Sequence, residues 1–158
     1  MKSIRGAHIV VVAASKHGPV LTARLCRMDV ALVTPVADLE EARRLCRAGG
    51  VDACIVMFDD CIADAEPLAE SDAPGRHCGV PSLMFVPQVT PHLRAVARRC
   101  GYLAAVPAAI PPRLLYRRIG GALQQRRAAR RSPPRRPAGI VPLLELPRTA
   151  RFSRPTIH

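Results

Sequence analysis

The chain lacks any apolar run long enough to cross a membrane. Its longest apolar stretches, such as residues 9–14 and 83–87, fall far short of the roughly 20 residues that a spanning helix needs. A signal peptide is not expected either, because Lys2 and Arg5 precede only a short strand-like run with no small-residue cleavage site. The composition of the 158 residues, 49% apolar and 23% charged, is typical of a globular protein, which we expect to be cytoplasmic.

The chain also lacks the common motifs of metal and nucleotide sites. Six cysteines are scattered with no Cys-x-x-Cys pair, so zinc-ligand spacing is missing and we expect reduced thiols, most of them in the core. A metal site assembled in space from Cys78, His77 or Cys61 is the alternative. The chain contains neither of the glycine-rich motifs that commonly bind nucleotide phosphates, Gly-x-Gly-x-x-Gly and Gly-x4-Gly-Lys-Ser/Thr. No histidine accompanies a serine or cysteine in a recognisable nucleophile motif. We therefore expect no cofactor and no enzymatic activity.

Acidic residues are almost missing from the last third of the chain. Residues 1–101 hold 12 Lys+Arg and 11 Asp+Glu, a net charge of +1. Residues 102–158 hold 12 arginines and a single acid, Glu145, a net charge of +11. Nearly all of the basicity therefore belongs to the C-terminal part, which points to an acidic partner there or to a solvated basic surface.

Short apolar runs alternate with helical patterns, which predicts a parallel sheet covered by helices. Two helix starts are specific: Asp38 opens an Asp-x-x-Glu capping box, and Thr90 precedes Pro91 at a first helical position. Residues 59–79 mix acids with prolines and predict a loop with a short helix over about 62–69. The pattern predicts strands over residues 7–13, 30–33, 52–58, 82–86 and 102–106, and the other helices over residues 18–28, 38–49, 91–100 and 111–123.

Four stretches resemble the bacterial response-regulator receiver domain. Residues 47–57, Arg-Ala-Gly-Gly-Val-Asp-Ala-Cys-Ile-Val-Met, are similar to the exit of its second helix and its third strand. Residues 80–86 are similar to its fourth strand, and residues 100–107 and 112–119 to its fifth strand and closing helix. The resemblance implies an α/β, flavodoxin-like domain over residues 1–123, with a five-stranded parallel sheet in the order 2-1-3-4-5 and helices on both faces.

The resemblance also places the family's phosphorylation residues on this chain, and each position holds an inert side chain. The acidic pair that holds Mg²⁺ falls on Ala13 and Ala14, and the phospho-accepting aspartate falls on Met57. The hydroxyl residue that senses the phosphate falls on Val86, and the lysine of the fifth strand on Ala108. Phosphoryl transfer needs a carboxylate nucleophile, Mg²⁺ and a cation, so these positions predict a pseudo-receiver without the reaction.

Asp59 offers one alternative to this interpretation. Asp59 lies two residues after Met57, so its side chain points to the same face of the strand. A slip of two residues would bring it near the position of the family's phospho-accepting aspartate, where it would keep some capacity to bind phosphate or metal. Even then the acidic pair and the lysine would be missing. Otherwise Asp59 is a loop acid that caps the following short helix.

The resemblance implies a docking surface as well. In receivers the fourth helix, fifth strand and fifth helix form the usual face for docking and dimerisation. Here that face would present arginines and one tyrosine, residue types enriched at interfaces: Arg94, Arg98, Tyr102, Arg113 and Arg117, with Arg99 and Arg118 beside them. We expect a protein partner, a sensor kinase or regulator of two-component signalling or a phosphorelay, or else a homodimer.

The tail, residues 124–158, predicts a flexible segment; the alternative for its first residues is an extension of the fifth helix that the Ser-Pro-Pro at 132–134 stops. It is rich in arginine and proline and has Phe152 as its one aromatic residue, so it cannot bury enough surface to fold alone. Its first arginines are Arg126, Arg127, Arg130, Arg131, Arg135 and Arg136. The second function class is therefore a nucleic-acid-associated regulator whose tail neutralises phosphates; attraction to a membrane surface is a third.

Overall fold

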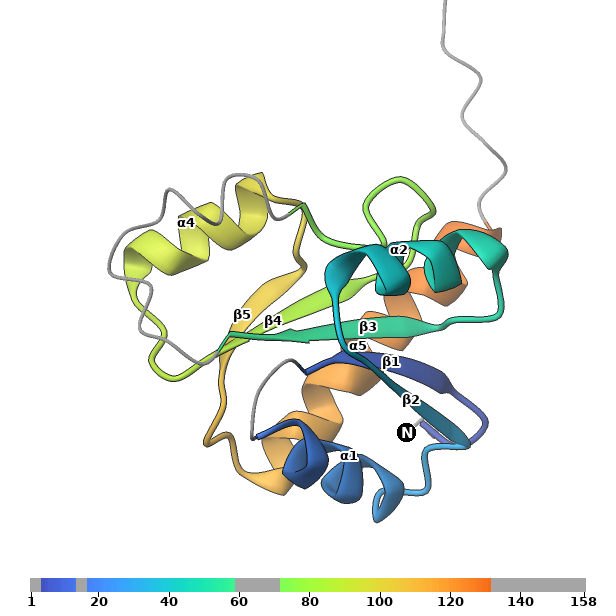
Figure 1. The fold of residues 1–158 in the computed structure, drawn as a ribbon, viewed down its shortest axis with the longest axis horizontal. Helices are drawn as coiled ribbons and strands as arrows, with labels where there is room; N and C mark the ends of the chain where they lie inside the picture. The colour runs from blue at the N-terminus through green and yellow to red at the C-terminus, as the bar shows by residue number, and fades with distance from the viewer. Residues whose placement is uncertain (1–3, 14–16, 59–71, 132–158) are drawn as a thin grey trace, which may run out of the picture.

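A computed structural model describes residues 4–13, 17–58 and 72–131 (Figure 1). Five parallel strands form one sheet in the order β2-β1-β3-β4-β5, the flavodoxin-like order that the sequence predicts. The strands are β1 (His8–Val12), β2 (Leu32–Val36), β3 (Ala53–Met57), β4 (Ser82–Val86) and β5 (Ala104–Pro107). The helices are α1 (Gly18–Cys26), α2 (Leu39–Ala48), α4 (Pro91–Arg99) and α5 (Pro112–Arg131). The short helix predicted over residues 62–69 lies outside the described residues.

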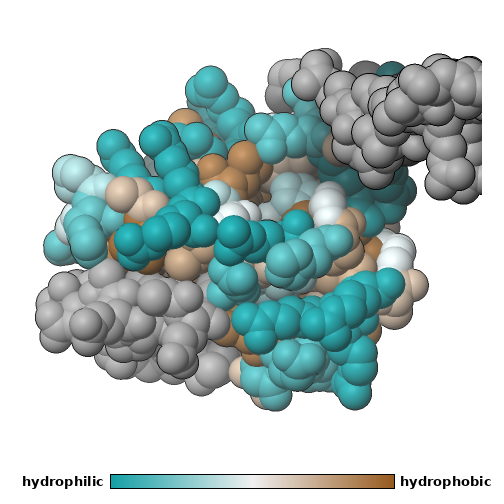
Figure 2. Space-filling model, turned by 90° about the horizontal axis from the view of Figure 1, so that it is seen from above, coloured by the Kyte–Doolittle hydropathy of each residue, from teal (hydrophilic) through white to brown (hydrophobic). Residues whose placement is uncertain are grey.

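The sheet separates two apolar cores. On one face Val10, Cys54 and Met84 pack against α2 and α4, and on the other Ile9, Ile55 and Phe85 pack against α1 and α5. Side chains of successive strand residues point to opposite faces, so these central strands are apolar on both sides. Figure 2 views the molecule from the side of α2 and α4; most of the described surface there is hydrophilic, and apolar side chains show only in the gaps.

The predicted caps are present. Asp38 Oδ1 accepts a hydrogen bond from the Glu41 amide at 2.8 Å, and Thr90 Oγ1 accepts one from the Leu93 amide at 3.1 Å. Each bond satisfies an amide that the first helical turn leaves without a backbone partner. Gly49 ends α2 with a φ of 89°, in the left-handed region that glycine adopts without strain.

Two strands differ from their predicted bounds by two or more residues at one end. The second was predicted over residues 30–33 and lies at Leu32–Val36, where Pro35 pairs with Val11. Pro35 is tolerated because β2 is an edge strand. The fifth was predicted over residues 102–106 and begins only at Ala104.

Two helices differ as well. α1 was predicted to run to residue 28 and ends at Cys26, and its Val20 is 59% exposed. α5 was predicted to end near Leu123 and instead continues to Arg131. It continues because its buried stripe does: Leu115, Ile119, Ala122 and Leu123 are followed at helical spacing by Arg126, which is also buried. The start of the predicted tail is therefore part of the folded domain.

Candidate functional site

The positions that the resemblance links to phosphorylation meet at one edge of the sheet. Parallel strands end at the same edge, so the ends of β1, β3, β4 and β5 lie together there. Ala13 follows β1, and its amide donates to Val36 O. Met57 ends β3 opposite Phe85, and Val86 ends β4 opposite Pro107. The Ala108 amide donates to Val86 O at 2.8 Å. We call these four residues the carboxyl edge; Ala14 and Asp59 lie outside the described residues.

The carboxyl edge is apolar and closely packed. Ala13 and Met57 pack against the core beneath α1 and α5, and Val86 is buried in the core beneath α4. The first turn of α1 lies directly against Ala13, since a Cβ placed on Gly18 would come within 2.3 Å of Ala13 Cβ. None of these four side chains carries an oxygen, the ligand that Mg²⁺ prefers.

A basic groove runs between α4 and α5, with β5 as its floor. Its volume is about 460 Å³. The floor is apolar, formed by Leu103, Ala104, Ala105 and Pro107, and three arginines stand around it: Arg94 and Arg98 from α4 and Arg118 from α5. All three are exposed, and neither helix contains an acidic residue. The groove therefore combines an apolar contact surface with a positive rim that no acidic residue of α4 or α5 offsets.

The predicted interaction face needs one correction. Arg94, Arg98, Arg113 and Arg117 are exposed, whereas Tyr102 is only 3% exposed. Tyr102 follows the turn after α4 and its ring lies edge-on to Phe58, with centroids 6.5 Å apart. Burial is the main reason that the pKa of its phenol is raised above the ordinary value. Tyr102 is thus a core residue and not part of the exposed face, and β5 begins only at Ala104.

The opposite edge of the sheet, where the strands begin, holds a buried arginine that sequence reasoning assigned to the tail. Arg126 is 7% exposed, and its Nε lies 3.8 Å from Asp52 Oδ1 at the start of β3. Asp52 Oδ2 already accepts the His8 amide at 3.0 Å. Nε and Nη1 of Arg126 are buried without a hydrogen-bond partner. Burial, and then the charge of Arg130, lower the pKa of this guanidinium.

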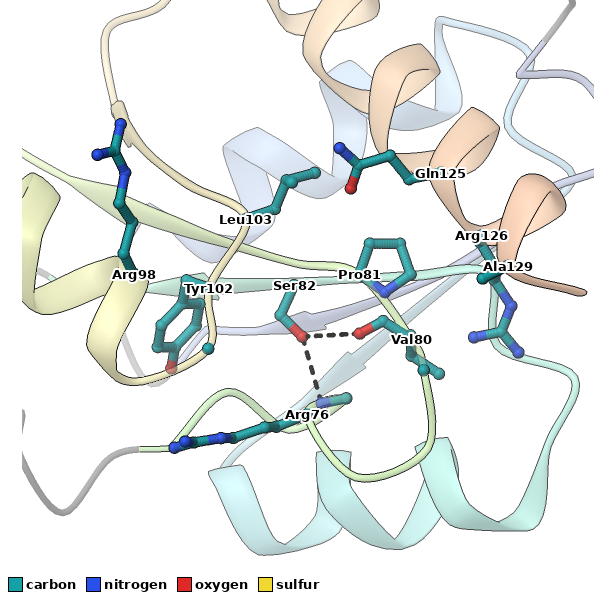
Figure 3. A pocket seen from close by; sticks show the side chains of 13 residues that line it. Arg76, Val80, Pro81, Ser82, Arg98, Tyr102, Leu103, Gln125, Arg126 and Ala129 are labelled. Carbon is teal, nitrogen blue, oxygen red and sulfur yellow. Dashed lines mark hydrogen bonds between the residues drawn. The ribbon is translucent and has the colours of Figure 1, made fainter. Parts of the chain in front are cut away.

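A hollow of about 480 Å³ lies beside Arg126 (Figure 3). Buried Ser82 accepts the Gly75 amide at 3.2 Å and donates to Val80 O at 3.4 Å, which holds the turn before β4. Gly75 allows this approach, since a Cβ there would lie 1.8 Å from Val80 O. Arg76 and Arg98 also line the hollow, but in Figure 3 the three guanidinium groups point away from one another. The hollow therefore has no convergent set of cations for an anion.

The other arginines predicted for the tail lie partly within α5 and partly beyond its end. Arg127, Arg130 and Arg131 are exposed in its last turns, and Arg135 and Arg136 lie outside the described residues.

Among the described residues no group of three His, Cys, Asp or Glu side chains could hold a metal ion, and no helix is long and apolar enough to span a membrane. Of the alternative metal ligands, His77 is exposed, Cys78 is half-buried and Cys61 is not described.

No protein-family model and no curated protein matches the chain. Solved structures do match. The signal receiver domain of an HD domain-containing protein from Pseudomonas fluorescens aligns with a TM-score of 0.62 at 16% identity, over 82% of this chain and 95% of that one. A putative pilus assembly-related protein from Burkholderia pseudomallei gives 0.60 at 18%, over 75% and 90%. The receiver domain of the sensor histidine kinase PA1611 from Pseudomonas aeruginosa, solved with magnesium in its active site cleft, gives 0.56 at 20%, over 75% and 98%. The chain therefore has the receiver fold.

Proposed function

We propose that this chain is a receiver-like regulator of two-component-type signalling that works without phosphorylation, by docking a protein partner in the groove between α4 and α5. The apolar carboxyl edge carries the first half of the proposal. A phosphorylated receiver must hold Mg²⁺ and a carboxylate there, as the magnesium in the PA1611 cleft illustrates. Here Ala13, Met57, Val86 and Ala108 stand in those places as degenerate positions, and neither enzymatic activity nor a cofactor is part of the proposal.

The groove between α4 and α5 supports the second half of the proposal, the docking of a protein partner. Arginine side chains over an apolar floor suit a partner with an acidic rim and an apolar centre, such as a sensor kinase or another regulator. A symmetric dimer through the same groove would bring Arg94, Arg98 and Arg118 against their own copies, with no acid on α4 or α5 to offset them. A different protein is therefore the favoured partner over a homodimer.

Acetyl phosphate, a small-molecule phosphoryl donor, tests whether the chain can be phosphorylated. Incubation of the full chain with acetyl phosphate and Mg²⁺ should leave its intact mass unchanged, because the carboxyl edge offers no nucleophile. A gain of one phosphoryl group that disappears in Asp59→Ala would overturn the phosphorylation-independent function and favour the slipped register.

Docking is tested by charge reversal with a matched control. The groove variant Arg94→Glu, Arg98→Glu, Arg118→Glu should lose the proteins that the wild type captures from a bacterial lysate. The control Arg27→Glu, Arg44→Glu, Arg47→Glu changes the net charge equally on exposed positions of α2 and the end of α1, and should keep them. Equal loss in both would mean non-specific attraction. A wild type that is dimeric in light scattering, with a monomeric groove variant, would make the partner a second copy.

The second candidate function is nucleic-acid binding, favoured by the exposed Arg127, Arg130 and Arg131. With Arg135 and Arg136, about five phosphate contacts are available, since Arg126 is buried. Affinity for duplex DNA should then fall by roughly two to three decades between about 50 and 200 mM salt. Changing these five arginines to Gln should abolish binding and leave capture through the groove intact. Absence of binding at low salt would exclude this function.

A further inference from the structure

The groove between α4 and α5 continues into the hollow beside Arg126. Arg98 and Leu103 line both of them, so the two form one continuous channel along α5, which we call the α4–α5 channel. Arg118 stands near one end of this channel, and Ala129 lines the other end. At ~1.5 Å per residue, the helix between these two residues is roughly 16 Å long, enough to accommodate a short peptide segment.

The floor of the α4–α5 channel is apolar, and its rim is positive. Leu103, Ala104 and Pro81 are only half-buried on this floor, and Figure 3 shows Leu103 and Pro81 at the hollow. Apolar surface of this kind is stabilised when another apolar group covers it. The arginines of α4 and α5 are offset by no acid of either helix. The channel therefore suits an occupant that combines apolar side chains with a carboxylate.

Gly121 widens the α4–α5 channel. Arg118, Gly121 and Gln125 follow one another at helical spacing, so Gly121 lies on the face of α5 that borders the channel. A glycine in the middle of a helix weakens the helix, yet a Cβ at Gly121 would meet nothing within 4 Å. Packing within the described residues therefore does not require this glycine, whereas an occupant that approaches α5 closely does.

The chain itself contains a segment with this chemistry. Residues 140–147, Ile-Val-Pro-Leu-Leu-Glu-Leu-Pro, are an apolar stretch within the arginine- and proline-rich tail. Glu145 is the single acid of residues 102–158, and it stands between Leu144 and Leu146. One short segment therefore offers leucines for the floor of the channel and a carboxylate for its arginines.

The segment also starts from the right place. α5 ends at Arg131, two residues after Ala129, which lines the channel. Ile140 follows Arg131 by nine positions, and an extended chain of that length reaches roughly 30 Å. Arg118, near the far end of the channel, lies only about 20 Å back along the helix. A tether this short holds the segment at an effective concentration on the order of mM, which favours it over a separate molecule.

We propose that residues 140–147 bind in the α4–α5 channel of their own chain, with the leucines on its floor and Glu145 beside the arginines of its rim. The inference deepens the proposed function and rests on it in one respect: the bound segment covers the groove that we assign to the protein partner. The partner must therefore displace the segment, and the tail regulates docking by occupying the same surface.

The test is photo-cross-linking of the full chain with p-benzoylphenylalanine in place of Leu144. After irradiation and tryptic digestion, we expect the label joined to peptides 100–113 and 119–126, which contain β5 and the middle of α5, in a product of monomer mass. The same label in place of Ile157 should give several-fold less of these products. Products of dimer mass would make the occupant the tail of a second copy and overturn the proposal. Labelling spread evenly over the chain would overturn it as well.

Two adjacent glycines of α5 provide matched variants for this cross-link. Gly121→Leu places a branched side chain in the channel and should lower the yield several-fold. Gly120→Leu places the same side chain on another face of α5 and should leave the yield unchanged. Both should keep the wild-type circular dichroism spectrum, because a Cβ at either position meets nothing within 4 Å. An unchanged yield in Gly121→Leu would refute the placement of the segment.

Charge exchange tests the contact of Glu145. Arg98→Glu should lower the yield of the cross-link several-fold, and combining it with Glu145→Arg should restore most of the yield. The control Arg99→Glu changes the charge equally at an exposed position of α4 that does not line the channel, and should have no effect. Failure of the combined variant to recover would overturn the assignment of Glu145 to the rim.

Partner docking is measured separately. In the full chain, Leu143→Ser with Leu144→Ser should raise several-fold the amount of protein captured from a bacterial lysate, because the segment no longer covers the groove. Unchanged capture would overturn the regulation by the tail. The cross-link needs no partner, so its absence counts against the tail segment alone. Capture that the groove variant does not lower counts against the proposed function alone.

Discussion

The two edges of the sheet have opposite chemistry. At the carboxyl edge, Ala13, Met57, Val86 and Ala108 are all apolar, although the resemblance to receiver domains implies metal and phosphate chemistry at these positions. At the other edge, which we call the amino edge, Asp52 and Arg126 bring opposite charges into or close to the interior. The comparison teaches that one scaffold tolerates charge at either edge, and that the fold alone does not say which edge holds the chemistry.

The largest expected effect is at the amino edge. Asp52→Ala removes the acceptor of the His8 amide and the carboxylate nearest to Arg126, leaving a buried cation without a counter-charge. We expect the free energy of unfolding to fall by about 2–3 kcal/mol in urea denaturation. Asp52→Asn keeps an acceptor for the amide and should lose about half as much. Equal losses would show that the charge of Asp52 contributes nothing.

A smaller effect is expected at the carboxyl edge. Met57→Asp places a carboxylate on a half-buried apolar position with no cation supplied by Ala13 or Ala108, and should cost about 1–2 kcal/mol. Met57→Leu, which keeps the volume, should stay within about 1 kcal/mol of the wild type. Addition of Mg²⁺ should restore no stability to Met57→Asp. A Mg²⁺-dependent rise in its melting temperature would show that the edge still provides metal ligands.

The smallest effect on stability is expected when the positive charge of Arg126 at the amino edge is removed. Arg126→Met keeps the length of the side chain and the packing of α5, and it removes a cation whose burial is poorly compensated. Its free energy of unfolding should lie within about 1 kcal/mol of the wild type, in either direction. A loss of more than about 3 kcal/mol would mean that the guanidinium has strong partners.

Sequence patterns predicted much of this fold. Alternation of apolar runs predicted the five strands, their order followed from the resemblance, and β4 lies at its predicted bounds because its five residues are buried on both faces. The edge strand β2 was predicted less well. Its Pro35 indicates the end of a strand when the sequence is taken alone, yet an edge strand accommodates proline, so β2 continues to Val36.

The site was predicted unevenly for a similar reason. The carboxyl edge could be located by counting from glycines, because strand ends are fixed by the loops that follow them. Arg126 was missed because an arginine reads as surface or tail, and only its spacing from Ala122 and Ile119 indicated a buried position.

Proline occurs in both strands that border the sheet, Pro35 in β2 and Pro107 at the end of β5. An exposed strand edge is otherwise a template on which another extended chain can add, and proline interrupts the row of amide donors that such addition requires. Self-association into a continued sheet is thereby discouraged at β2, where the Pro35 position faces outward. At β5 the Pro107 position faces β4, on the same side as the Leu103 amide that donates to Ser82 O. A partner that binds in the groove beside β5 meets the side chains of Arg94, Arg98 and Arg118 there, so its affinity should be sensitive to ionic strength.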